Sequence, residues 1–243
     1  MPSSREALAE LLRRNDAEAV IEAARKGARG TSPGGPGGAS RGMIRTLTGL
    51  LYHDEELVRW RAVSMLGRLA EAEPELVRPV VSRLLWFMSE ESSTVGWGSA
   101  QAIAEIYRRA PNVGRDAIRV VVHFMDDEEL SEPANRNTYM LAGSIWAIGS
   151  LADPGQAAWT RGAAAEMIKL AAEMKEPLVK FLRDPDTQVR GLAAWALGRL
   201  RHDGARGELE RLLDDGAVFQ LYEDETLRDI PVREAAANAL KAI

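Results

Sequence analysis

Apolar residues recur along the chain in five stretches that share one eight-residue spacing. The stretches begin at Val58, Val95, Met140, Val189 and Val232, and another apolar residue follows eight positions after each of these. At about 100° per residue, positions 0, 4, 8 and 11 of this frame fall within about 80° of arc and form one apolar stripe on a helix. Helices that cannot bury such stripes alone stack on one another, so the pattern predicts a helical solenoid.

The periodic segments predict helices that pair around short turns. The expected helices cover residues 4–14, 16–28, 41–52, 55–71, 74–88, 94–109, 113–125, 136–151, 160–174 and 187–201, and a last unit begins near Ala205. Together they predict an all-α fold, an α-α superhelix of about five to six helix pairs.

The last unit contains an insertion whose composition favours strands over helix. β-branched and aromatic residues at Val218–Tyr222 and Thr226–Ile230 flank the acidic triplet at residues 223–225. Such residues on either side of a three-residue turn predict a small β-hairpin near the C-terminus. Because terminal repeats are usually atypical, we expect this hairpin to cap the open end of the stack.

A segment dense in glycine and proline follows the first helix pair, and its composition does not favour a helix. It lacks the Gly-Lys-Ser/Thr ending and the preceding strand of a phosphate-binding loop, so we interpret it as a flexible linker. We expect an N-terminal helix pair at residues 1–28, a loop at residues 29–42 that detaches this pair from the main stack, and the solenoid at residues 43–243.

Composition and charge narrow the range of functions. The formal net charge of -5 argues against a nucleic-acid binder that works by bulk electrostatics. The absence of cysteine excludes disulfides, thiolate nucleophiles and cysteine-based metal sites, and it fits a cytoplasmic location. No apolar run approaches about 18 residues, so we expect no membrane span, and the charged N-terminal stretch resembles neither a signal peptide nor an anchor.

One unit carries the motif of a known repeat. Residues 184–200, DPDTQVRGLAAWALGRL, contain an Asp/Pro turn, then Val-Arg, two alanines and Ala-Leu-Gly-x-Leu. This pattern resembles the HEAT-like repeat named after the phycobilisome (PBS) chromophore lyases. Residues 54–69 match it well, whereas Gly96 and Leu141 replace the arginine in the second and third units. The resemblance covers about residues 41–243 and implies a HEAT-like solenoid, a fold that serves as a scaffold in many systems.

The frame also separates positions that pack against other helices from positions that are expected to face the concave surface. Positions 2, 3, 6, 10 and 13 lie away from the apolar stripe, and in a solenoid of this type they line the concave face. Our candidate binding residues on that face are Trp60, Arg61, Arg68, Trp97, Gln101, Glu105, Trp146, Trp195 and Arg199. Tryptophans are common interface anchors, although they also fill gaps between units built from alanine and glycine. A mixed aromatic groove suits a peptide, a protein segment or a planar ligand better than a phosphate backbone.

We find no pattern of residues that predicts catalysis. The carboxylates at residues 126–129 are expected to form a solvated charge run, and no Ser/His/Asp or nucleotide-binding spacing stands out. We therefore expect a non-catalytic interaction scaffold with no cofactor and no metal, which binds an unidentified protein or peptide. The resemblance leaves two alternatives: a chromophore lyase-type subunit that binds a planar tetrapyrrole, and a HEAT-like DNA glycosylase.

Overall fold

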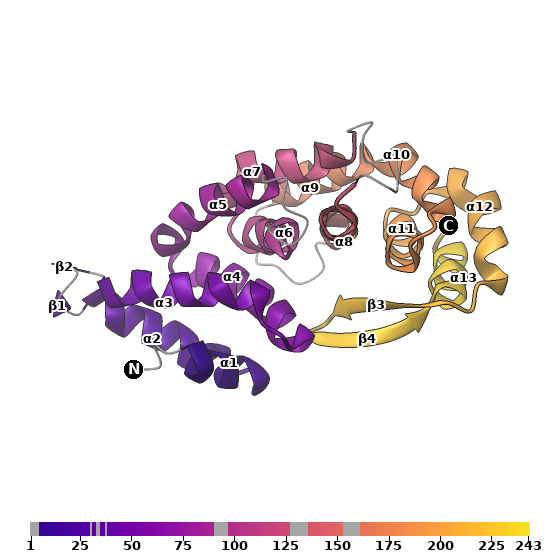
Figure 1. The fold of residues 1–243 in the computed structure, drawn as a ribbon. Helices are drawn as coiled ribbons and strands as arrows, with labels where there is room; N and C mark the ends of the chain where they lie inside the picture. Colours follow the sequence, from indigo (N-terminus) through magenta and orange to yellow (C-terminus); the bar gives the residue numbers. More distant parts are fainter. Residues whose placement is uncertain are drawn as a thin grey trace.

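The computed structural model describes residues 5–29, 31–32, 35–36, 38–89, 97–126, 136–152 and 161–243. Within these ranges the chain forms thirteen α-helices and two antiparallel hairpins, which confirms the predicted superhelix and the C-terminal hairpin. The helices follow a curved path in two layers (Figure 1). Residues 94–96 of an expected helix and the carboxylates at residues 127–129 lie outside the described ranges.

The inner layer consists of the five helices that carry the repeated frame. They are α4 (Glu56–Ala72), α6 (Ser99–Arg109), α8 (Thr138–Ala152), α11 (Thr187–Arg199) and α13 (Val232–Ala242). The outer layer consists of α3 (Gly38–Gly49), α5 (Pro74–Ser89), α7 (Pro111–His123), α9 (Arg161–Ala172), α10 (Lys175–Val179) and α12 (Arg206–Arg211). Each inner helix packs on the next one along the chain.

The inner helices approach one another closely at position 9 of the frame. This position holds Gly67, Ala104, Gly149 and Gly198. A Cβ on Gly67 would lie 2.8 Å from the backbone oxygen of Glu105, and one on Gly149 would overlap the indole ring of Trp195. The small residues therefore set the spacing between α4 and α6 and let the Trp195 ring cross towards α8.

We expect the substitution Gly67→Ala to lower the free energy of unfolding by about 1–3 kcal/mol, because the added methyl group must push the backbone of α6 away. Gly49→Ala is the matched control. Gly49 has right-handed helical dihedral angles, and no atom lies within 4 Å of a Cβ built there. That substitution should be neutral or stabilise the protein by up to about 1 kcal/mol. Urea unfolding followed by circular dichroism measures both, and equal effects would contradict the close packing.

The N-terminal helices α1 (Arg5–Arg13) and α2 (Ala17–Arg29) pack against the solenoid, which differs from the expected detachment. Leu8, Leu12, Val20 and Ala24 are buried. The Arg61 side chain donates hydrogen bonds to the backbone oxygens of Leu12 (3.0 Å) and Arg13 (2.6 Å). The apolar stripes of this first pair thus bury themselves on α3 and α4.

The expected loop at residues 29–42 is shorter than its composition suggests. Thr31–Ser32 (β1) and Gly35–Pro36 (β2) pair as short antiparallel strands, and α3 already begins at Gly38. The buried Ser40 hydroxyl donates to the backbone oxygen of Ala24 at 2.6 Å, which fixes the first turn of α3 to α2. Tertiary contacts therefore outweigh the low helix propensity of glycine at this helix start.

The C-terminal hairpin consists of β3 (Val218–Glu223) and β4 (Thr226–Pro231). Glu223 pairs with Thr226, so the turn contains two residues, Asp224 and Glu225, rather than the three that we expected. Both have positive φ angles, 50° and 59°, as in the type I′ turns that suit the twist of hairpin strands.

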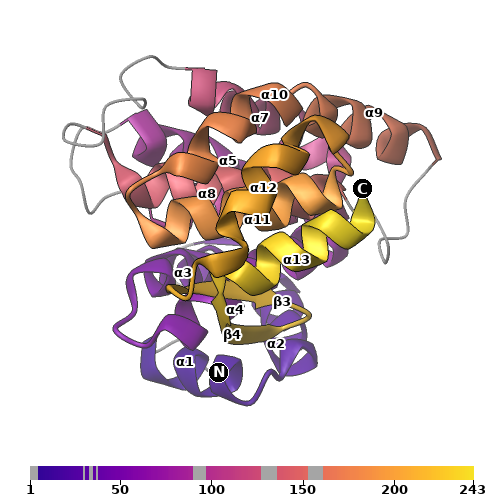
Figure 2. The same cartoon turned by 90° about the vertical axis from the view of Figure 1, so that its right-hand side faces the viewer.

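The position of this hairpin corrects the sequence-based expectation. Instead of capping the end of the stack, β3 and β4 extend from α13 across the concave side to α4, and they connect the last inner helix to the first (Figures 1 and 2). A two-stranded hairpin is only marginally stable in water by itself. Here β3 and β4 are stabilised because they pack on inner helices.

A buried ion pair connects the start of α8 to the turn before α11. The guanidinium of Arg136 donates two hydrogen bonds to the carboxylate of Asp184, at 2.6 and 2.5 Å. Both side chains are almost completely buried, with exposed fractions of 2% and 4%. Asp184 also accepts the backbone N–H of Asp186, the N-cap residue of α11. The pair therefore joins two repeat units at a turn that the HEAT-like motif contains.

Candidate functional site

Several cavities border the C-terminal hairpin, and two of them, on the inner face of the solenoid, are lined by Trp146. The first, of about 590 Å³, lies among the C-terminal halves of α4, α6, α8 and α11 and the hairpin tip, which comprises residues 222–225. We call it the charged cavity. The second, of about 620 Å³, lies among the N-terminal halves of α4, α8 and α11 and residues that precede and begin α6, and we call it the aromatic cavity. Trp146 lines both cavities.

The structure places the predicted binding residues at three locations. Arg68, Glu105, Trp146, Trp195 and Arg199 line the charged cavity. Trp60, Trp97 and Gln101 line the aromatic cavity. Arg61 lines neither of these two, because its guanidinium is bound to the end of α1.

Aromatic rings meet where the hairpin crosses α4. The ring of Tyr222 stacks on Trp60, with centroids 5.0 Å apart and planes inclined by 10°. The ring centroid of Trp60 also lies 5.0 Å from that of Trp146 and 5.6 Å from that of Trp97, whose ring plane is inclined by 79°. Trp60 and Trp146 are only 6% and 4% exposed, whereas Trp97 and Trp195 are half-buried. Two of the four predicted tryptophans are therefore covered in this closed arrangement.

The inner helices bind the backbone of β3 through side chains. The amide of Gln188 donates to the backbone oxygen of Gln220 at 2.7 Å and accepts the backbone N–H of the same residue at 2.9 Å. The indole N–H of Trp146 donates to the backbone oxygen of Tyr222 at 2.9 Å. An extended strand is thus held by its main chain, two residues apart, from α11 and α8.

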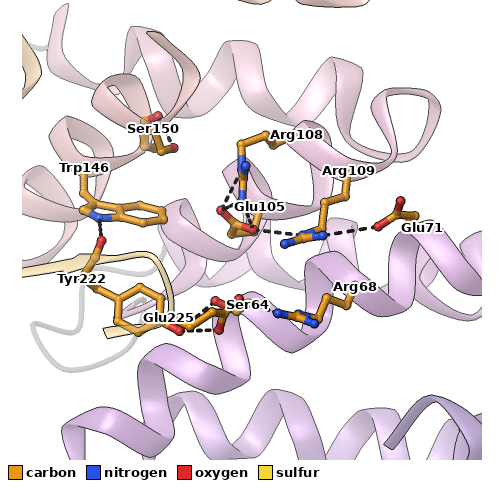
Figure 3. Close-up of polar contacts among 11 residues, drawn as sticks. Ser64, Arg68, Glu71, Glu105, Arg108, Arg109, Trp146, Ser150, Tyr222 and Glu225 are labelled. Atoms are coloured by element: carbon orange, nitrogen blue, oxygen red, sulfur yellow. Dashed lines mark hydrogen bonds and ion pairs between the residues drawn. The ribbon is translucent and has the colours of Figure 1, made fainter. Parts of the chain in front are cut away.

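Polar contacts fix the hairpin tip to α4. The guanidinium of Arg68 donates to the carboxylate of Glu225 at 2.9 Å (Figure 3). The Tyr222 hydroxyl donates to the same carboxylate at 2.8 Å and lies 3.1 Å from the hydroxyl of Ser64. The last residue of the turn is therefore bound from two directions.

A second carboxylate of the tip is bound by α11. The guanidinium of Arg199 donates to Glu223 at 2.5 Å, and the indole N–H of Trp195 donates to the same oxygen at 3.3 Å. Arg228 on β4 donates to the other oxygen at 2.8 Å. Glu223 is thereby enclosed by three donors.

The base of the hairpin is anchored separately. Arg190 on α11 donates to the carboxylate of Asp215 at 2.7 Å, and this hydrogen bond lowers the pKa of Asp215. The same carboxylate accepts the backbone N–H of Ala217, and the backbone oxygen of Asp215 accepts the N–H of Arg233. The base and the tip are therefore held by different residues.

The surroundings of the hairpin tip shift the pKa values of Tyr222 and Glu225. Burial, together with the charge of Glu225, raises the pKa of the Tyr222 phenol far above its ordinary value, so the phenol stays protonated and donates. Burial alone would raise the pKa of Glu225. The hydrogen bonds from Arg68 and Tyr222 outweigh this effect, so the pKa of Glu225 is lowered below 4.5.

The lowered pKa of Glu225 predicts a pH-dependent contribution to stability. A carboxylate whose pKa falls on folding stabilises the fold fully above its unfolded pKa, near 4.5, and loses this contribution as the pH falls through the folded pKa. Wild type should therefore exceed Glu225→Gln in unfolding free energy by a constant margin at neutral pH. The margin should shrink below pH 4.5. Urea unfolding at a series of pH values measures it, and a margin independent of pH would contradict the assignment.

Sequence reasoning did not identify Tyr222 and Gln188 as site residues. Tyr222 lies in the insertion, outside the repeated frame, and Gln188 immediately precedes the first frame position of its unit. The available signals were an aromatic residue before an acidic triplet and an amide in the first turn of α11. Neither indicates a partner more than thirty residues away.

In the part of the chain that the structure describes, no group of three or more His, Asp or Glu side chains is arranged to hold a metal ion. Likewise, no helix in the described ranges combines the length and the apolar content needed to cross a bilayer.

One segment of the chain matches a known family of repeats. Residues 139–200, from α8 to α11, match the family model of the HEAT-like repeat. The chain contains a HEAT-like repeat. An 80-residue segment is 38% identical to an uncharacterized protein of Archaeoglobus fulgidus, and the match covers 33% of this chain and 43% of that relative. The chain thus spans less than half the length of the curated relative that it matches.

Among solved structures, the chain is similar to an engineered protein and to a designed armadillo repeat protein. An engineered protein has a TM-score of 0.50 and 18% identity over 98% of both chains. A designed armadillo repeat protein has a TM-score of 0.46 and 19% identity, over 97% of this chain and 98% of that one. At 18% identity, the likeness to the engineered protein concerns the fold alone.

Proposed function

We propose that the protein is a non-catalytic scaffold that binds an extended segment of a partner protein on its concave face, among Trp60, Trp97, Trp146 and Trp195. One observation supports this most: the face already binds an extended strand of its own chain. Gln188 and Trp146 hold the backbone of β3 by hydrogen bonds that any peptide could make.

The aromatic cavity offers the anchors that peptide binding needs. Trp97 is half-buried, and Tyr139, on the first turn of α8, is 61% exposed. Gln101 and Gln188 add amide groups to the same lining. Large aromatic side chains bury much area and have few rotamers to freeze, so they are frequent hot spots of interfaces. The PBS-lyase type of the repeat stays a prediction from the motif at residues 184–200.

A selection of displayed random peptides against the wild-type protein tests this function. Peptides that bind should lose about tenfold or more in affinity on Trp97→Ala, because an anchor ring is removed. Trp86→Ala is the matched control, since Trp86 is 55% exposed on the outer helix α5. That substitution should leave binding unchanged, and circular dichroism checks that both variants keep their helices. Binding that depends on Trp86 and not on Trp97 would reject the concave face as the site.

A further inference from the structure

The helices around the hairpin tip carry an excess of positive charge. Among the described residues that line the charged cavity, the helices contribute four arginines and one carboxylate. These residues are Arg68, Arg108, Arg109, Arg199 and Glu105. The other acidic residues of the lining, Glu223, Asp224 and Glu225, belong to the hairpin tip. The tip therefore supplies the charge that balances this part of the inner face.

The arginines divide into two groups by their partners. Arg108 and Arg109 bind Glu105 from the same helix, and Arg109 also binds Glu71 at the rim (Figure 3). Arg68 and Arg199 instead bind the tip, through Glu225 and Glu223. Removal of the tip would take a carboxylate partner from each of these two arginines. Charge-assisted hydrogen bonds of this kind contribute more than neutral ones, so the site favours an acidic ligand.

The spacing of the bound groups defines a recognition pattern. The aromatic ring of Tyr222 occupies the slot on Trp60, the next residue binds Arg199 and Trp195, and the residue three positions on binds Arg68. The pattern is therefore an aromatic residue with carboxylates at the first and third following positions. Its main chain is bound at the aromatic residue by Trp146.

Glu225 stands at a turn position that favours glycine. Type I′ turns favour glycine at the second central position, where φ is positive. Here that position holds Glu225, with φ 59°, and the carboxylate of this residue contacts Arg68. A residue unfavourable for the backbone thus stands where its side chain meets the inner face.

We propose that the concave face is specific for an acidic, aromatic segment of a partner, with the pattern aromatic–acidic–any–acidic, and that Tyr222–Glu225 occupy this site as an internal ligand until the partner displaces them. This inference rests on the proposed function. A tethered ligand competes at an effective concentration in the millimolar range, so the hairpin sets an affinity that a partner must exceed. Because the base is anchored separately at Asp215, the tip and β3 can leave the inner face while the hairpin stays tethered to α11 and α13.

A fluorescent peptide with the sequence of residues 218–231 serves as the probe. The variant E223Q/E225Q leaves the Tyr222 ring unchanged and replaces both carboxylates, which should weaken the tip as a competitor. Fluorescence anisotropy should show that this variant binds the probe about tenfold tighter than wild type does. The control is the same peptide with glutamine at its two corresponding positions, which should bind the variant about tenfold more weakly than the acidic probe. Adding Arg68→Ala to the variant should likewise weaken binding of the acidic probe.

The outcomes separate this inference from the proposed function. Equal binding of the acidic and the neutral peptide to E223Q/E225Q would overturn the acidic specificity but leave a peptide-binding face. Equal binding of the acidic probe to wild type and E223Q/E225Q would overturn the role of the tip as a competitor. Failure of both probes and of every display-selected peptide to bind the concave face would overturn the proposed function itself.

Discussion

Replacing Asp184 by alanine should lower the free energy of unfolding by about 3–5 kcal/mol, because the guanidinium of Arg136 would stay buried without its carboxylate. Arg136 donates two short hydrogen bonds to Asp184, and both side chains are almost inaccessible to water. The substitution also removes the acceptor for the backbone N–H of Asp186, at the turn that starts α11. Urea unfolding followed by circular dichroism at neutral pH measures the loss.

The double variant Arg136→Met/Asp184→Leu is the control for this prediction. Apolar side chains of similar volume often replace a buried ion pair at little cost, so the double variant should recover most of the stability that Asp184→Ala loses. A loss below about 1 kcal/mol for the single substitution would show that water reaches the pair. A double variant less stable than Asp184→Ala would show that the contacts are needed for packing rather than for charge.

The second large effect concerns the hairpin. Tyr222→Ala should lower the free energy of unfolding by about 3–5 kcal/mol, as other large aromatic-to-alanine substitutions in cores do. Tyr222 is 4% exposed, and its ring fills the slot against Trp60. Loss of the ring should also uncover Trp60, which shifts the tryptophan emission of the native protein to longer wavelength. Urea unfolding and the native emission spectrum measure the two effects.

Two controls separate the ring from its surroundings. Tyr222→Phe keeps the stacked ring and removes the hydroxyl that contacts Glu225 and Ser64, so it should cost about 1 kcal/mol. Tyr139→Ala removes an exposed tyrosine from the same face and should change stability by less than about 0.5 kcal/mol. A Tyr222→Ala variant as stable as Tyr139→Ala would contradict the closed arrangement of the hairpin.

The local period of the sequence was sufficient to predict the fold. Apolar residues at one repeated spacing require helices that stack, and the structure has these helices in one inner layer. Small residues at position 9 of the frame indicated close approach, and a Cβ on Gly67 would indeed lie 2.8 Å from the backbone oxygen of Glu105. The hairpin was also visible, because its strands are local and rich in β-branched and aromatic residues.

The location of the hairpin was not predictable in the same way. Tyr222 meets Ser64 across 158 residues of sequence, and local periodicity carries no information about such a pairing. Arg61 shows a related limit. Its position in the frame predicted a side chain on the open concave face, but this side chain binds the backbone of α1, which lies outside the frame. The frame therefore locates a face, while tertiary contacts decide which residues on that face stay open.

Hydrogen–deuterium exchange of wild-type protein, with and without a saturating display-selected peptide, tests the central claim most directly. The claim is that the concave face binds an extended segment and that the hairpin now occupies the place of that segment. Bound peptide should increase exchange at residues 218–223, where the N–H of Gln220 loses its bond to Gln188, and should protect α8 and α11. Unchanged exchange in the hairpin, with protection confined to the outer helices, would contradict the account.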